Sequence, residues 1–136
     1  IGLSNLANIE LANKDYPSAE HNYREALHIA EKINYQEGVA IMKGNLAELA
    51  LDREQWTEAE SLAREALALA EKVGRQELIA GDCHRLAKAL LKQNRNLEEA
   101  LSMSRRAVEI YMRLRSPSLQ SAQNLLAKIE EKLKEK

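Results

Sequence analysis

The sequence repeats itself at a fixed spacing, and this internal repeat limits the possible folds more than any other feature. A Leu-Ala pair recurs at 6–7, 46–47 and 86–87, which is every forty positions. Within each unit, apolar residues recur every three or four positions, as on one buried face of a helix. A fixed period of this size, built from helices, is typical of a helical solenoid. Two ladders of single alanines follow the same spacing with one additional residue, which we expect in the turn at 94–96: Ala19, Ala59 and Ala100, and Ala26, Ala66 and Ala107.

We therefore predict an all-α fold, a right-handed α–α superhelix of three helix pairs followed by a closing helix. The pairs cover about 1–35, 36–75 and 76–116, and the closing helix covers about 118–134. Strong helix formers dominate the composition, and five glycines and two prolines leave little turn chemistry for a sheet. The chain begins at Ile1, inside the first expected helix, which predicts a fragment of a longer protein.

Several residues predict where individual helices begin and end. Pro17 suits the first turn of a helix, where its missing N–H is not needed. Asn34 and Gly74 lie one full period apart and can close a helix in the left-handed conformation. The pairs Thr57 with Glu60, and Asn96 with Glu99, predict capping boxes, in which the first residue caps the helix and the second reaches back.

The alanine ladders predict where helices cross. Two helices approach closely only where a small side chain lies at the contact, and a larger residue there costs roughly 1–3 kcal/mol. We expect the ladders to mark these crossings. The larger Tyr16, Trp56 and Leu97 are predicted to pack at the turn between the two helices of each pair.

Charge and composition restrict the classes of function. The net charge of −1 argues against binding of nucleic acid by bulk electrostatics. Residues 1–75 carry 8 basic and 13 acidic side chains, whereas residues 76–136 carry 12 and 8, so the two halves have opposite net charge. A single cysteine, Cys83, excludes an internal disulfide and is expected to be a small buried residue. No apolar run is long enough to span a bilayer, and we expect a soluble cytoplasmic protein without a membrane partner.

The first unit carries Leu6-Ala7-Asn8, Asp15-Tyr16, Ala19, Tyr23 and Ala26-Leu27. These residues stand where the tetratricopeptide repeat has Leu-Gly-Asn, Asp-Tyr, Ala, an aromatic residue and Ala-Leu. The chain resembles this family over essentially its whole length, in a long-helix variety whose period exceeds the ~34 residues usual in the family. The aromatic residue expected early on the first helix is replaced by Leu3, Lys43 and Cys83, and the proline expected after the second helix is absent. Similar long repeats occur in spindle-orientation adaptors, bacterial peptide-sensing regulators and the sensor ends of bacterial signalling ATPases.

This resemblance implies a concave face, lined by the first helix of each unit, that binds a protein or peptide without catalysis. Asn8 would hold the peptide backbone, and the charge asymmetry predicts a partner with an acidic segment. Glu48 stands at a groove position and argues against a clamp for a terminal carboxylate. The groove residues implied are Asn8, Glu48, Asp52, His84, Lys88, Lys92, Asn124 and Lys128, with Ser4, Ala12, Ile41, Gly44 and Gly81 at further groove positions.

Other functions have less support in the residues. His21 and His28 lack a third ligand for a metal site, and no motif for a cofactor or for catalysis is present. Glu48 and Asp52 argue against a helical repeat that binds RNA. The main alternative is a structural or regulatory segment of a larger multidomain signalling protein, such as the sensor end of a bacterial signalling ATPase. In that alternative the repeats pack on neighbouring domains or associate with another copy through uncovered terminal helices.

Overall fold

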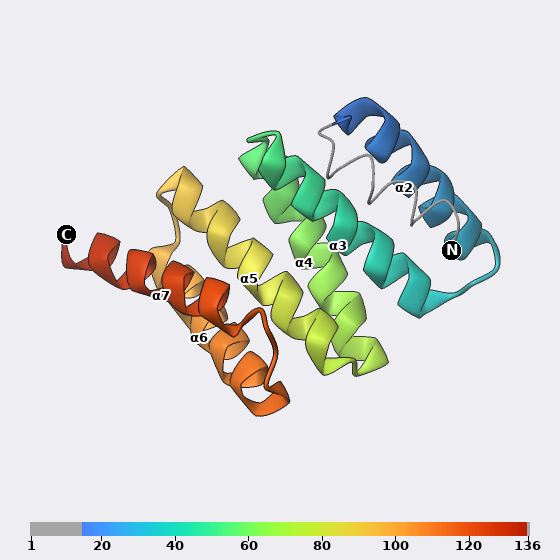
Figure 1. Ribbon diagram of the computed structural model, residues 1–136. Coiled ribbons are helices and arrows are strands. Elements are labelled where there is room, and N and C mark those ends of the chain that lie inside the picture. Colours follow the sequence, from blue (N-terminus) through green and yellow to red (C-terminus); the bar gives the residue numbers. More distant parts are fainter. Residues whose placement is uncertain (1–14, 136) are drawn as a thin grey trace.

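The computed structural model describes residues 15–135 of the 136-residue chain. These residues form six helices and no strand, and consecutive helices pack antiparallel in a stack (Figure 1). The expected all-α solenoid is thereby confirmed. The first helix of the first expected pair lies outside the described residues. The residues predicted for it include Leu6, Ala7 and the proposed groove residues Ser4, Asn8 and Ala12. The helices are α2 (Tyr16–Lys32), α3 (Gln36–Asp52), α4 (Trp56–Val73), α5 (Gln76–Gln93), α6 (Leu97–Leu114) and α7 (Leu119–Lys134).

The alanine ladders lie where the helices pack against one another. Ala26 is half-buried and packs beside Tyr23 at the first end of the described stack. The other ladder residues, and the alanines of the second and third Leu-Ala pairs, have no room for a larger side chain, which supports the predicted register of the helices. Those with 0% exposure are Ala19, Ala47, Ala59, Ala66, Ala87, Ala100 and Ala107.

The turn residues behave as the sequence predicts at most positions. Leu97 is buried, and Trp56 is half-buried against the cluster that contains Leu51 and Ala89. Asn34 and Gly74 have positive φ angles of 61° and 83°, the left-handed conformation expected of them. Pro17 lies in the first turn of α2.

The additional residue of the third unit enters at Asn96. The amide of Arg95 donates to the carbonyl of Leu90, as the amide of Gln55 donates to Ala50 one period earlier. The next equivalent bonds run from Ala100 to Asn96 and from Ala59 to Gln55, so the spacing between the units has grown by one position. Asn96 has a positive φ of 50°, a conformation that asparagine tolerates better than most residues.

The two predicted capping boxes are wrong. Helix α4 begins after Gln55 rather than after Thr57, and neither α4 nor α6 has a hydrogen bond from a capping side chain. Glu60 and Glu99, which were expected to reach back to the backbone, both bind Arg64 instead. A carboxylate bonded to an arginine has a charged partner, whereas in a capping box its partner is a neutral backbone N–H, so the ionic contacts prevail.

Neighbouring units are joined by ionic clusters that repeat along the chain. We call Glu20, Arg24, Arg53 and Glu58 the first clamp. Arg24 Nε donates to Glu20 at 2.9 Å and its Nη2 donates to Glu58 at 3.3 Å, while Arg53 also reaches Glu20 at 2.9 Å. This clamp joins α2 to α4 and to the end of α3 through side chains that are 30–48% exposed.

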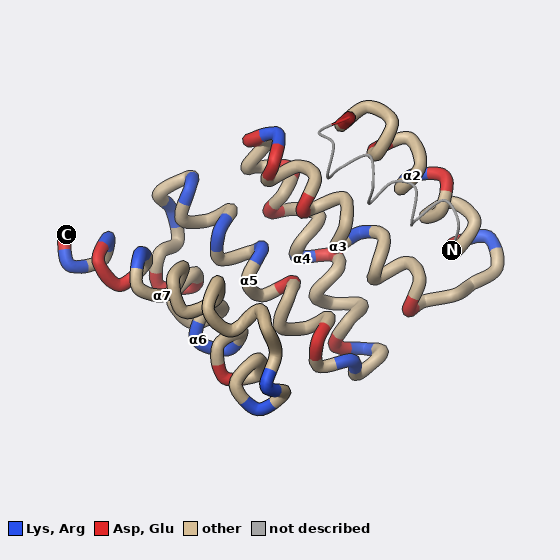
Figure 2. Tube along the Cα trace, viewed as in Figure 1, with Lys and Arg blue, Asp and Glu red and all other residues tan. Residues whose placement is uncertain are grey.

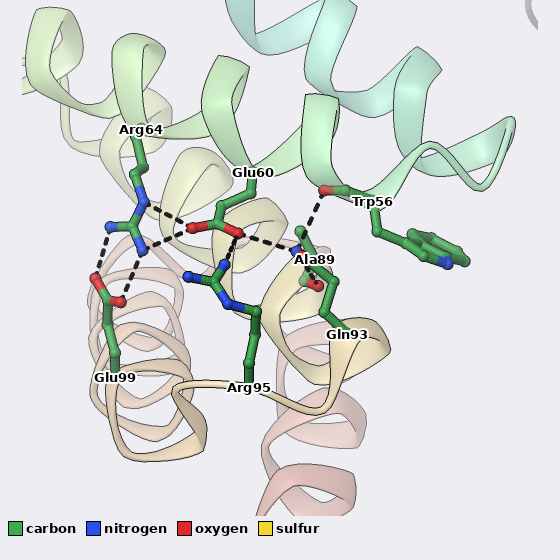
Figure 3. Close-up of polar contacts among 7 residues, drawn as sticks. All are labelled: Trp56, Glu60, Arg64, Ala89, Gln93, Arg95 and Glu99. Carbon is green, nitrogen blue, oxygen red and sulfur yellow. Dashed lines mark hydrogen bonds and ion pairs between the residues drawn. The ribbon is translucent and has the colours of Figure 1, made fainter.

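The second clamp repeats the first, one period later, and consists of Glu60, Arg64, Arg95 and Glu99 with Gln93 (Figure 3). Arg64 donates two hydrogen bonds to Glu99, at 2.7 and 2.8 Å, and a third to Glu60 at 3.1 Å. Glu60 also accepts from Arg95 and, at 3.0 Å, from Gln93. The clamp therefore joins α4, the α5–α6 turn and α6.

The curvature of the stack follows from which helices lie closest together. The backbone of α3 lies near that of α5, and α5 lies near α7, whereas no comparable contact joins α2 to α4 or α4 to α6 within residues 15–135. A stack whose alternate helices are closer together on one side curves toward that side. Helices α3, α5 and α7 therefore form the concave face, with α4 and α6 behind them (Figure 1).

Candidate functional site

The predicted groove residues within the described range all lie on the three helices of the concave face. Helix α3 carries two of them, α5 carries three and α7 carries two. Glu48, His84 and Lys88 are half-buried, and the others are exposed: Asp52, Lys92, Asn124 and Lys128. Glu48 and His84 line one pocket together with Gly81, which was also a predicted groove position, and the rest are distributed along the face.

Arg85, which the sequence reasoning missed, lies at the centre of this face. Its Nε donates to Glu48 at 3.1 Å, and its Nη1 donates to Asp82 at 2.9 Å. Glu48 is therefore ion-paired, because a guanidinium from the next unit holds one of its oxygens. The spacing of Asp82 and Arg85 by three residues on a predicted helix was a signal for part of this arrangement.

Two glycines make room for the Arg85 guanidinium. A Cβ atom at Gly44 would lie 3.1 Å from Asp82 Oδ1 and 3.2 Å from Arg85 Nη1, and one at Gly81 would lie 3.1 Å from Arg85 Nη1. Such contacts are tighter than ordinary van der Waals packing. The resemblance placed Gly44 and Gly81 in the groove. Because they lack a Cβ atom, they leave space for the Arg85 guanidinium between α3 and α5.

A pocket of about 160 Å³ opens beside Arg85, between α3, α5 and the start of α7. Its lining is mostly polar, with hydroxyl groups from three side chains. The lining residues are Glu48, Gly81, His84, Arg85, Tyr111, Ser118 and Ser121.

Burial shifts the pKa values of three consecutive residues on α5. Desolvation raises the pKa of Asp82 to about 6, although the charge of Arg85 opposes this change. Desolvation also raises the pKa of the Cys83 thiol to about 11, so this buried cysteine remains protonated, as expected of a structural residue. The pKa of His84 is lowered, again mainly by burial, so its ring is neutral at pH 7.

The shifted pKa of Asp82 predicts a specific pH dependence of stability. The folded state binds the proton of the Asp82 carboxyl more tightly than the unfolded state does. The stability that this proton contributes is therefore fully present below the unfolded pKa of 3.8 and is lost as the pH rises through about 6. His84 acts oppositely, losing stability as the pH falls below its unfolded value of 6.5. We expect Asp82→Asn to remove the pH dependence that Asp82 causes. The difference in free energy of unfolding between this variant and wild type should therefore change by on the order of 1 kcal/mol between pH 7.5 and pH 5.

Urea unfolding of both proteins at the two pH values measures this change. Glu109→Gln, which removes an exposed carboxylate on α6, is the matched control and should show no such change. If the stability of Asp82→Asn relative to wild type is the same at both pH values, Asp82 is not the titrating group.

The lysines of the concave face lie toward the C-terminal halves of α5 and α7, and basic positions are seen along both helices in Figure 2. Lys92 Nζ lies 5.6 Å from the centre of the Trp56 ring, a cation–π distance. Lys88 and Lys128 have no carboxylate partner within the described part of the chain. Acidic positions gather instead near the turn between α3 and α4 (Figure 2).

Other chemistry that the sequence raised finds no geometric support. His21 and His28 are both exposed, and His21 contacts Glu25 on its own helix. Residues 15–135 contain no group of three or more His, Cys, Asp or Glu side chains placed to hold a metal ion. None of the described helices combines the length and the apolar character that a bilayer crossing requires.

Solved structures of similar shape are repeat proteins. BtubC (BKLC) from P. vanneervenii matches with a TM-score of 0.81 and 21% identity, over 96% of this chain and 55% of that one. A structure of nearly identical TPR-like repeats of kinesin light chain type from Podosopora anserina matches with a TM-score of 0.80 and 22% identity, over 96% and 65%. The N-terminal domain of stress-induced protein-1 (STI-1) from C. elegans matches with a TM-score of 0.67 and 21% identity, over 91% of both chains.

These likenesses concern the fold alone, because the identities of 21% and 22% are low. The chain spans only 55–65% of the length of the first two structures. No curated protein matches this sequence significantly. The tetratricopeptide repeat model matches residues 1–72 and 38–113, which together cover most of the chain. With this match and the helical stack described above, the chain belongs to the tetratricopeptide repeat family.

Proposed function

We propose that the concave face of α3, α5 and α7 binds an extended segment of a protein partner, and that this chain has no catalytic role. Membership of the tetratricopeptide repeat family favours a protein-interaction scaffold. The finer part of the proposal is that the lysines at the C-terminal halves of α5 and α7 hold acidic residues of the partner.

The observation that carries this proposal is the difference between paired and unpaired basic residues on the same helices. Lys43 on α3 binds Glu65 at 2.7 Å, and Arg85 on α5 binds Glu48 and Asp82. Lys88, Lys92 and Lys128 have no such ion pair within residues 15–135. Their ammonium groups remain available to carboxylates from outside the chain.

Double charge reversal on α5 tests the proposal. We expect Lys88→Glu with Lys92→Glu to reduce affinity for an acidic peptide at least tenfold, because two attractive contacts become repulsive. The probe is a fluorescein-labelled ten-residue peptide with four consecutive glutamates, and the readout is fluorescence anisotropy at low salt. Circular dichroism should show unchanged helicity.

Lys32→Glu with Lys72→Glu is the matched control, since it changes the net charge equally on α2 and α4, away from the concave face. This control should retain most of the affinity. Unchanged affinity of the Lys88→Glu and Lys92→Glu variant, or an equal loss in the control, would sink the proposal.

A second candidate function, packing on a neighbouring domain or on another copy of the chain, is favoured by exposed apolar side chains. Ile29, Ile33 and Tyr35 are 47%, 66% and 51% exposed at the end of α2 and the turn that follows. If this surface mediates self-association, light scattering across a concentration series gives a rising mass, and Ile33→Glu returns the protein to a monomer. A constant monomer mass for the wild type would contradict self-association.

A further inference from the structure

The carboxylate of Glu48 and the guanidinium of Arg85 are the two charged groups of the pocket wall. The single guanidinium of Arg85 is shared by two carboxylates, those of Glu48 and Asp82. The Asp82 side chain is 3% exposed and does not line the pocket, whereas the Glu48 side chain is 39% exposed and does. A ligand carboxylate placed here would be a third acidic group around one arginine, which is unfavourable.

The other polar groups of the pocket wall can accept hydrogen bonds. The hydroxyls of Tyr111, Ser118 and Ser121 each accept as well as donate. The neutral ring of His84 also has one acceptor nitrogen. An apolar ligand group would desolvate these atoms without replacing their bonds to water, which costs free energy.

An alkylammonium group matches both properties, since it carries one positive charge and three donors and has no acceptor. We propose that this pocket takes a lysine side chain of the bound segment, with its ammonium group against the exposed carboxylate of Glu48 and the surrounding hydroxyls. This inference rests on the proposed function, and it adds a basic residue to a ligand that is otherwise acidic.

The geometry of α5 sets the spacing between the two parts of the ligand. Lys88 and Lys92 follow Arg85 by three and seven residues, or roughly 4.5 and 10.5 Å along the helix axis. An extended peptide covers about 3.3 Å per residue. The ligand lysine and the acidic residues are thus separated by about one to three positions.

A small-molecule titration tests the pocket independently of the acidic ligand. We expect n-butylammonium chloride at millimolar concentration to shift the Nε–Hε NMR signal of Arg85 in a saturable manner, whereas sodium butyrate and n-butanol do not. Glu48→Gln, which keeps the shape and one acceptor but removes the charge, should reduce this shift at least fivefold. An equal shift with butyrate, or an unchanged response in Glu48→Gln, would overturn the inference.

Two labelled peptides test the same pocket in the context of the groove. Both contain four glutamates, and three positions before the first glutamate one peptide has lysine and the other norleucine. We expect the lysine peptide to bind wild type about fivefold more tightly and to lose this preference in Glu48→Gln. Lys88→Glu with Lys92→Glu should weaken both peptides equally.

The outcomes separate the two proposals. Equal binding of both peptides to wild type contradicts the lysine pocket and leaves the acidic groove supported. A response to n-butylammonium without binding of either peptide supports the pocket and contradicts the acidic groove.

Discussion

Ala59→Leu should lower the free energy of unfolding by about 1–3 kcal/mol, because the added methylene and methyl groups have no space at this helix crossing. Ala59 is 0% exposed and packs in α4 against Ala50, Leu51 and Ala89 from α3 and α5. Leucine and alanine have similar intrinsic helix propensities, so the loss would come from packing rather than from the helix itself. Urea unfolding followed by circular dichroism measures the difference.

Ala68→Leu is the matched control for this substitution. Ala68 lies nine residues later on the same helix and is exposed, so the same added atoms extend into solvent. We expect a change within about 0.5 kcal/mol. Equal losses for the two variants would mean that the assigned register of α4 is wrong.

Glu60→Gln should destabilise the fold by about 1–2 kcal/mol at pH 7, because it replaces an ionised acceptor at the centre of the second clamp. The side chain of Glu60 is 11% exposed and accepts hydrogen bonds from Arg64, Gln93 and Arg95. Burial alone would raise the pKa of Glu60, but the hydrogen bonds from Gln93 and Arg64 and the charges of Arg95 and Arg64 together outweigh it and the pKa is lowered.

The lowered pKa of Glu60 gives this prediction a second readout. Its stabilising contribution is present above the unfolded pKa of 4.5 and is lost as the pH falls through the lower folded value. The difference between wild type and Glu60→Gln should therefore shrink as the pH is lowered below 4.5. A difference that stays constant with pH would show that the charge of Glu60 is not what stabilises the fold.

Glu20→Gln is the matched control from the first clamp. Glu20 occupies the equivalent position one period earlier, but its side chain is 35% exposed. Solvent screens ion pairs of this kind, and they contribute little to stability. We expect a loss below about 0.5 kcal/mol, and a loss as large as that of Glu60→Gln would contradict burial as the reason for the difference.

The candidate site was only partly predictable from the sequence. The helical period placed Glu48, His84, Lys88 and Lys92 on the first helices of their units, away from the alanine ladders. That these helices line the concave face was implied only by the family resemblance. The period did not predict that Glu48 is held by Arg85, since these residues are 37 positions apart and belong to different units. Whether these side chains bind a partner remains a proposal.

The contacts of the two clamps were also only partly predictable from the sequence. Three clamp residues recur after one period, so the repeat of the clamp was present in the sequence. The recurring pairs are Glu20 and Glu60, Arg24 and Arg64, and Glu58 and Glu99, with the additional residue included in the last pair. Local rules nevertheless assigned Glu60 and Glu99 to capping boxes, because those rules consider only residues a few positions apart. The third unit has Leu101 at the position equivalent to Glu60, and the clamp is not repeated there.

The sequence by itself determined the all-α class, several helix ends, the crossing alanines and the turn at 94–96 that contains the additional residue. These features depend on periodicity, small side chains and turn chemistry, which act over a few residues and recur with each unit. Only the tertiary structure decided which carboxylates meet which guanidinium groups, the pocket beside Arg85 and the raised pKa of Asp82. Those features depend on how neighbouring units stack, and stacking joins side chains that no local pattern relates.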